Sequence, residues 1–480
     1  MQRPHRLSGL DAGFLSLETS TQPLQVVTVL ELDTSTIPGG YSFEALRDAF
    51  AQRIQAIPEF REKLSSHPLD LDHPVWVEDG DFDIDRHVRR MVIRPPGSRA
   101  ELAEICGKLG GLPVDRSRPL WEMWVIEGLS DSPGAWAGES AGAQRVAVLL
   151  KVHHAAADGM TFVNFLSSLC SPEPQPPRAE LAEAAIDTGA LTETIDGLVG
   201  FVRRPLNLIT TVLPAAFAAV IDAVRRSAAG RAMAAPFTAP RTVLNTGFTA
   251  QRNIAFARLD LRDVKAVKDH FGVKVNDVVM ALVSGVVRQF MQDRAELPGK
   301  SLVAMQPVSV HGLSDSTARN QVSGMLVHLQ TDIADPVERL KAVAEANRIA
   351  KEQVSAIRPT LLEDFGETVG AVLLGIAKRV YARLTKFRPM YNVILSNVPG
   401  PDSGRYFLGA EIKAAYPFGP ILLGAGLNFT LWSMNGYLHM GLISCPSLIP
   451  NLSDLADGVT AGLDEFVAEI GGEPTASAAI

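Results

Sequence analysis

Cysteine is scarce in this sequence, and none of the spacings that cysteine-based sites require is present. Cys106, Cys170 and Cys445 are the only three in 480 residues, and no two of them form a CxxC pair. Disulfide frameworks and zinc knuckles need closely and regularly spaced cysteines. We therefore expect no disulfide scaffold and no metal site, and a reducing compartment fits best.

Long apolar runs are also missing. The uncharged run from Pro205 to Ile221 is interrupted by Pro214, and it is shorter than the ~20 apolar residues of a membrane-spanning helix. The first residues include basic side chains but no apolar core of the length that a signal peptide needs. These absences predict a cytoplasmic protein without a membrane-spanning segment.

Positive charge is in deficit, with a formal net charge of -8. A chain of this charge has no overall attraction to nucleic acid, so we expect no nucleic-acid partner. Hydrophobic residues make up 46% and charged residues 20%, which is apolar but within the globular range. The length of 480 residues predicts two or three domains.

Apolar periodicity predicts an α/β protein with two folded halves. Strand patterns cover 23–32, 119–129 and 145–154, a helix pattern covers 42–55, and the alternation resumes after residue 241 with a long helix pattern over 275–292. Between the halves, a proline-rich segment is followed by an alanine-rich one. We predict an N-terminal domain over 1–170, a linker with helices over 171–240, and a C-terminal domain over 241–480.

Two adjacent histidines end the strand pattern of 145–154. Successive side chains on a strand point to opposite faces, so His153 and His154 cannot easily serve one atom together. His154 falls on the more apolar face, where burial would keep its imidazole neutral, as a general base requires. We expect at most one of the two to perform chemistry, and His154 is the candidate.

The residues after the histidines allow more than one interpretation. Asp158 stands where an N-cap would, before a helix pattern whose Phe162, Phe165, Leu166 and Leu169 share one face. The segment is then either a strand end with a capped helix or part of a catalytic site. GESAG at 138–142 matches the nucleophile-elbow pattern, but the strand follows the motif instead of preceding it. We reject Ser140 as a nucleophile.

The complete HHxxxDG pattern at 153–159 resembles the CoA-dependent acyltransferase superfamily. Further motifs narrow the resemblance to the bacterial wax ester synthase/acyl-CoA:diacylglycerol acyltransferase family: LSGLDAGFLSLE at 7–18, FDIDRHV at 82–88, PLW at 119–121, ND at 276–277, RNQVS at 319–323 and SNVPGP at 396–401. They follow one another in order over nearly the whole chain. The resemblance implies two chloramphenicol-acetyltransferase-like domains, each a mixed sheet with flanking helices, and an active-site tunnel between them.

The resemblance also implies roles for individual residues. His154 would be the general base, and Asp158 would brace its loop through an ion pair. His153 would be supporting, and Gly159 would allow a tight turn beside the tunnel. For substrate binding it points to the residues of the shorter motifs: Leu120, Trp121, Asn276, Asp277 and Asn397. A plain core role for Trp121 and a helix-cap role for Asn276 stay open, as does the identity of the oxyanion donors, for which Asn428 and Ser433 are candidates.

The implied activity is transfer of a long-chain acyl group from acyl-CoA, a substrate and not a cofactor, to diacylglycerol or a fatty alcohol without an acyl-enzyme. Two rivals remain: a condensation-like domain that takes the acyl group from a carrier-protein thioester, and an inactive relative that binds lipid. The sequence leaves the preferred alcohol, the acyl chain length and the oligomeric state open.

The segment 376–388 has the composition of an interfacial helix. It places Lys378, Arg379, Arg383, Lys386 and Arg388 among apolar residues. A solvated helix packed on the core explains the same pattern. We predict peripheral contact with the inner face of the membrane or with lipid droplets.

Overall fold

The fold is described from a computed structural model of the 480-residue chain. The structure describes residues 5–65, 73–130, 144–157, 159–175, 232–309, 322–356, 379, 381–398, 400 and 406–471. Asp158, the GESAG segment, Arg319 and most of the predicted linker lie outside the described residues.

The first half is built on a seven-stranded mixed sheet. Its strands, in spatial order, are β5 (Val88–Val92), β6 (Trp121–Glu127), β7 (Arg145–His153), β2 (Gln25–Asp33), β14 (Ala410–Phe418), β13 (Tyr406–Phe407) and β8 (Cys170–Ser171). β5 and β6 are parallel, whereas the other neighbours are antiparallel. Strands of the C-terminal half thus complete the N-terminal sheet, and the domain boundaries themselves stay a prediction.

The second half carries a six-stranded mixed sheet. Its order is β11 (Val322–His328), β10 (Val303–Ser309), β12 (Val393–Asn397), β15 (Leu427–Met434), β16 (Tyr437–Ser444) and β9 (Asn253–Asp260). β12 is parallel to both of its neighbours, and the remaining pairs are antiparallel. A small third sheet joins β1 (His5–Arg6), β4 (Val75–Glu78) and β3 (Glu62–Ser65). The predicted α/β class with two mixed sheets is confirmed.

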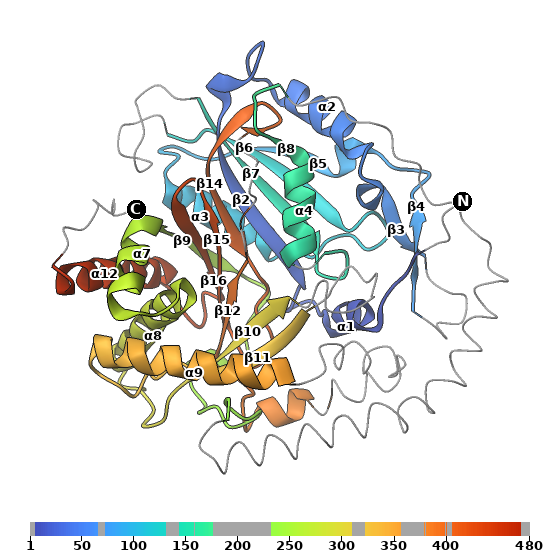
Figure 1. Cartoon of the computed structure of the whole chain (residues 1–480). Helices are drawn as coiled ribbons and strands as arrows, with labels where there is room; N and C mark the ends of the chain where they lie inside the picture. Colours follow the sequence, from blue (N-terminus) through green and yellow to red (C-terminus); the bar gives the residue numbers. More distant parts are fainter. Residues whose placement is uncertain are drawn as a thin grey trace.

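Helices cover both sheets (Figure 1). Those of the first half are α1 (Gly9–Leu17), α2 (Phe43–Ile54), α3 (Arg99–Gly110) and α4 (Gly159–Leu169), with short 3₁₀ turns at Thr34–Thr36, Pro58–Phe60 and Ile84–Arg86. Those of the second half are α7 (Leu261–Phe271), α8 (Val275–Asp293), α9 (Pro336–Ala356) and α12 (Leu452–Glu469), preceded by a 3₁₀ turn at Val243–Asn245. In Figure 1, α7, α8, α9 and α12 lie together on the outer side of the second sheet.

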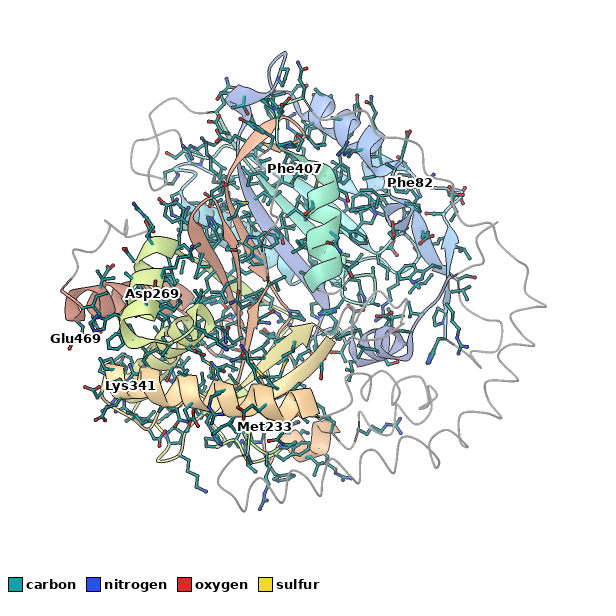
Figure 2. The ribbon with its side chains drawn as sticks, in the orientation of Figure 1. Phe82, Met233, Asp269, Lys341, Phe407 and Glu469 are labelled. Carbon is teal, nitrogen blue, oxygen red and sulfur yellow. The ribbon has the colours of Figure 1, made fainter. Side chains whose placement is uncertain are left out.

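Alternation along β7 divides the interior into two cores. Val148 and Leu150 pack with α2 and α4, on the side where Figure 2 labels Phe82 and Phe407. Ala147 and Leu149 face the other way, into a core shared with α3, α8, α12 and the second sheet. The two halves are therefore joined by one continuous core, and the predicted inward face of α4 is confirmed by the burial of Phe162, Phe165, Leu166 and Leu169.

All three cysteines are buried and free. Among the described helices, no single one has both the length and the apolar character of a membrane span. Only α7 and α8 taken together have both, and the two helices are bent by 100° relative to each other.

Candidate active site

Helix α1 and the residue that follows it contact the histidine pair. Ser8 caps the helix by accepting the Asp11 N–H at 3.1 Å. Phe14, in the middle of the helix, stacks on the His154 ring with centroids 4.1 Å apart and planes 18° apart. Glu18, directly after the helix, lies beside His153. One short helix and its C-cap residue therefore contact both imidazoles.

His153 is the last residue of β7 and is fully buried. Its Nδ1 accepts the Ala155 N–H at 3.0 Å, which leaves Nε2 as the ring nitrogen that can donate. Nε2 lies 3.5 Å from Oε1 of Glu18. Its backbone N–H donates to the Leu120 carbonyl at 2.9 Å. Both ring nitrogens thus face protein groups, and no face of the ring is open to a substrate.

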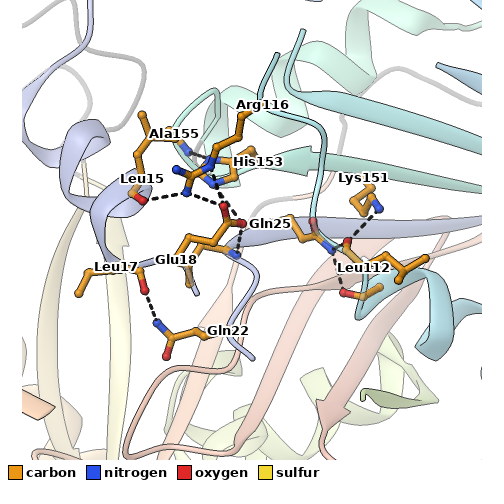
Figure 3. Close-up of polar contacts among 12 residues, drawn as sticks. Leu15, Leu17, Glu18, Gln22, Gln25, Leu112, Arg116, Lys151, His153 and Ala155 are labelled. Carbon is orange, nitrogen blue, oxygen red and sulfur yellow. Dashed lines mark hydrogen bonds and ion pairs between the residues drawn. The ribbon is translucent and has the colours of Figure 1, made fainter. Parts of the chain in front are cut away.

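Glu18 is the centre of a small ionic cluster (Figure 3). Arg116 donates from Nε to Glu18 Oε2 at 2.8 Å, and the Leu24 N–H donates to Oε1 at 3.2 Å. Burial by itself raises the pKa of the Glu18 carboxyl, but the hydrogen bond and charge of His153, with Arg116 and Leu24, outweigh it and lower that pKa to about 2. Glu18 is therefore a fixed negative charge over the pH range in which histidine titrates.

His154 lies in the turn after β7 and is half-buried. Its backbone N–H donates to the Leu24 carbonyl at 2.8 Å, and the Ala156 N–H closes the turn on the His153 carbonyl at 2.8 Å. Phe14 covers one face of the imidazole. Of the two histidines, only His154 combines a fixed backbone with partial exposure, so it is the better candidate for contact with a substrate.

Lys151 is a residue that the sequence reasoning passed over. It is fully buried on β7, and its Nζ lies 2.9 Å from Glu122 Oε2 and donates to the Leu112 carbonyl at 3.0 Å. Gln25 donates to the same carbonyl at 2.8 Å. Burial lowers the Lys151 pKa, which Glu122 partly restores. The end of α3 is thereby tied to the strand that carries the histidines (Figure 3).

The other predicted residues near the pair belong to the core. Leu120 and Trp121 are each 2% exposed. Trp121 donates from its indole N–H to the Phe60 carbonyl at 2.8 Å and stacks on His87 at 4.5 Å. Leu120 is tied to His153 by the backbone bond described above. Gly159 is the first residue of α4. These positions can support the site through packing.

Asn276 and Asp277 take part in a second polar cluster, at the start of α8. Asp277 accepts the Lys274 N–H at 2.9 Å through Oδ2 and the Asn347 amide at 2.7 Å through Oδ1. The Asn276 amide donates to Gln306 at 3.3 Å, and Gln306 donates to Asn347 at 3.2 Å. The alternative that Asn276 caps the helix is wrong, because Lys274 is the N-cap. Asp277 is the residue that satisfies the helix end.

Asn397 ends β12 and is exposed. The turn that follows packs tightly, since a Cβ on Gly400 would lie 1.8 Å from the Ser433 carbonyl oxygen. Asn428 is buried, and its amide is used within the fold: Nδ2 donates to the Pro420 carbonyl at 2.8 Å and Oδ1 accepts from Thr430 at 2.8 Å. Asn428 is therefore poorly suited as an oxyanion donor.

Within the described part of the chain, no three His, Cys, Asp or Glu side chains gather as metal ligands. What the described residues present is an enclosed imidazole in His153 beside the partly exposed His154. A partly accessible imidazole can move a proton to or from a hydroxyl group.

Comparison with known proteins identifies the family of the chain. The family model described as the wax ester synthase/diacylglycerol acyltransferase catalytic domain matches residues 7–279, and the model of the C-terminal domain of the same family matches residues 319–466. A Mycobacterium tuberculosis protein whose name describes it as a diacylglycerol O-acyltransferase is 48% identical over 463 residues, covering 96% of this chain and 90% of the relative.

Solved structures agree. The wax ester synthase/diacylglycerol acyltransferase from Marinobacter aquaeolei VT8 has a TM-score of 0.69 and 28% identity, covering 97% of this chain and 100% of that one. Trichothecene 15-O-acetyltransferase from Fusarium sporotrichioides shares the fold, with a TM-score of 0.60 at 11% identity, covering 96% of this chain and 95% of that one. The chain belongs to the wax ester synthase/diacylglycerol acyltransferase family and is an acyltransferase.

Proposed function

We propose that the protein transfers a long-chain acyl group from acyl-CoA to diacylglycerol, yielding triacylglycerol, and that it also accepts long-chain alcohols to yield wax esters. The names of the relatives, diacylglycerol O-acyltransferase and wax ester synthase, support both acceptors. The observation that carries the mechanism is the contrast within the histidine pair: the His153 ring is enclosed, and the His154 ring is partly accessible.

In the proposed reaction His154 acts as general base. Its neutral imidazole takes the proton of the acceptor hydroxyl while that oxygen attacks the thioester carbonyl carbon. The carbon–sulfur bond then breaks, and the proton passes from His154 to the departing CoA sulfur. Base assistance of this kind is worth ~10²–10⁴ in rate. No covalent acyl-enzyme and no cofactor take part.

The neighbours of His154 have positioning roles in this proposal. Phe14 fixes the plane of the His154 ring. Glu18 and the Ala155 N–H fix His153, which in turn holds the turn that carries His154. Asp158 is assigned the support of the same turn by resemblance. Leu120, Trp121, Asn276, Asp277 and Asn397 are proposed to shape the substrate tunnel, with the first two acting from within the core.

An acyl-transfer assay with the purified protein tests the proposal. The protein is given one acyl-CoA with a labelled acyl group and a mixed pool of diacylglycerol, fatty alcohol and water, and the labelled products are separated. We expect triacylglycerol as the main product, wax ester as a second product, and little free fatty acid. Ester formation from an acylated carrier protein but not from acyl-CoA would favour the condensation-like rival. Lipid binding without any ester would favour the inactive relative.

A further inference from the structure

Exposed large apolar side chains are rare on the described surface. Four are exposed, and two of them, Leu384 at 47% and Phe387 at 76%, lie three residues apart. The other two, Val92 and Leu112, come from separate elements of the first half. Scattered exposed apolar residues are ordinary, but a pair on one turn, with the larger ring mostly in solvent, is not.

The fold holds this pair outward. Residues 381–385 form a helical turn, and on its inner side Tyr381 donates from its hydroxyl to the Leu423 carbonyl at 3.2 Å. Thr385 is 2% exposed. The N–H groups of Phe387 and Arg388 both donate to the Leu384 carbonyl, at 3.0 and 2.8 Å. Because the inner side is anchored, the outward position of Leu384 and Phe387 follows from packing.

The charged residues next to the pair in the sequence are all cationic. Arg383, Lys386 and Arg388 are exposed, and none of them forms an ion pair with a described residue. No aspartate or glutamate occurs between Glu367 and Asp402, although the whole chain carries a net charge of -8. We call Arg383, Leu384, Lys386, Phe387 and Arg388 the 383–388 patch. Its helical turn is the short orange helix beneath the end of α9 in Figure 1.

We propose that the 383–388 patch docks the enzyme on an anionic phospholipid surface. Phe387 and Leu384 enter the boundary between headgroups and acyl chains, and the three cations bind lipid phosphates, as in interfacial amphipathic segments. A second copy of the chain docked through the same patch would oppose like charges. The inference deepens the proposed function, because a diacylglycerol acceptor resides in a lipid phase and has to be collected there.

Vesicle flotation with the full chain tests the patch. We expect binding to phosphatidylcholine vesicles that contain about 30 mol% phosphatidylglycerol, about tenfold weaker binding to phosphatidylcholine alone, and weakening with added salt. Leu384→Ser/Phe387→Ser and Lys386→Glu/Arg388→Glu should each lower binding to the anionic vesicles about tenfold. Val92→Ser, which changes an equally exposed apolar residue elsewhere, should bind like the unmodified protein.

A second readout separates this inference from the proposed function. Acyl transfer to an acceptor dispersed in detergent should be unchanged in the patch variants, whereas transfer to acceptor in anionic vesicles should fall. Unchanged vesicle binding in both double variants, or no binding by the unmodified protein, overturns the inference. If the patch variants lose binding to an acidic protein but still bind vesicles like the unmodified protein, the inference is overturned as well. Absence of transfer in detergent by the unmodified protein would count against the proposed function alone.

Discussion

Nε2 of His153 lies 3.5 Å from Oε1 of Glu18. The first residue after α1 thus faces the last residue of β7, and four residues earlier Phe14 covers the ring of His154. The N-terminal segment therefore belongs to the candidate site as much as the histidine motif does.

Replacing Glu18 with Gln should lower the free energy of unfolding at pH 7. The folded-state pKa of Glu18 is lowered from 4.5 to about 2, so its contribution is complete above pH 4.5 and is lost as the pH falls toward 2. A shift of this size corresponds to about 3.4 kcal/mol, which solvent screening of the half-buried carboxyl reduces to roughly 2–3 kcal/mol. Chemical denaturation at several pH values should show the difference between the two proteins closing across that range.

Glu104→Gln is the matched control for Glu18, because Glu104 forms an exposed pair with Lys108. Exposed pairs of this kind contribute about 0.3–0.5 kcal/mol. A loss in Glu104→Gln equal to that in Glu18→Gln, or a Glu18→Gln difference that persists at pH 2, would refute the role assigned to Glu18.

Replacing Phe14 with Leu should slow acyl transfer about tenfold with little change in thermal stability, since a small misplacement of a catalytic group is costly. Phe82→Leu is the control: Phe82 also stacks on a histidine, His87, with centroids 5.3 Å apart, but as part of the Trp121 cluster. Steady-state rates of both variants give the comparison. Equal rates of acyl transfer in the two variants would show that Phe14 does not position His154.

Replacing Lys151 with Met should destabilise the fold by about 3 kcal/mol, because it leaves Glu122 without its buried partner. Lys151→Met/Glu122→Leu should recover about 1 kcal/mol or more of that loss, since no buried charge then remains unpaired. Thermal or chemical unfolding measures both. A double variant less stable than Lys151→Met would contradict this account of the pair.

Most of the fold could be predicted from apolar periodicity. The strand pattern over 145–154 corresponds to β7, and the helix pattern over 275–292 corresponds to α8. The joining of β14 to β2 could not be predicted, because pairing between distant strands leaves no local pattern. Its effect is that the second half contributes to the first sheet.

The site was predictable where a motif carries it and not where it depends on long-range contacts. The opposite directions of the strand side chains follow from the period of two, and the structure places Ala147 and Val148 in different cores. Glu18 belongs to the motif at 7–18, but its approach to His153 depends on how α1 docks. Lys151 carried a usable signal, because it is a charged residue inside the otherwise apolar run of 146–152.

Replacing Asp277 with Ala should lower stability by about 2 kcal/mol, because the N–H of Lys274 and the amide of Asn347 both lose their acceptor. Asn276→Ala, which removes one longer hydrogen bond of 3.3 Å, should cost less. Chemical denaturation measures the loss of stability in each variant. If Asn276→Ala lost more stability than Asp277→Ala, Asn276 and not Asp277 would be the residue that holds this cluster together.

The most direct test of the mechanism is the rate of labelled acyl transfer from acyl-CoA to diacylglycerol by His154→Ala, with its folding checked by thermal unfolding. The account predicts a loss of about 10² or more in rate with the fold intact, and a smaller loss in rate for His153→Ala. A folded His154→Ala protein that transfers at the unmodified rate would contradict it.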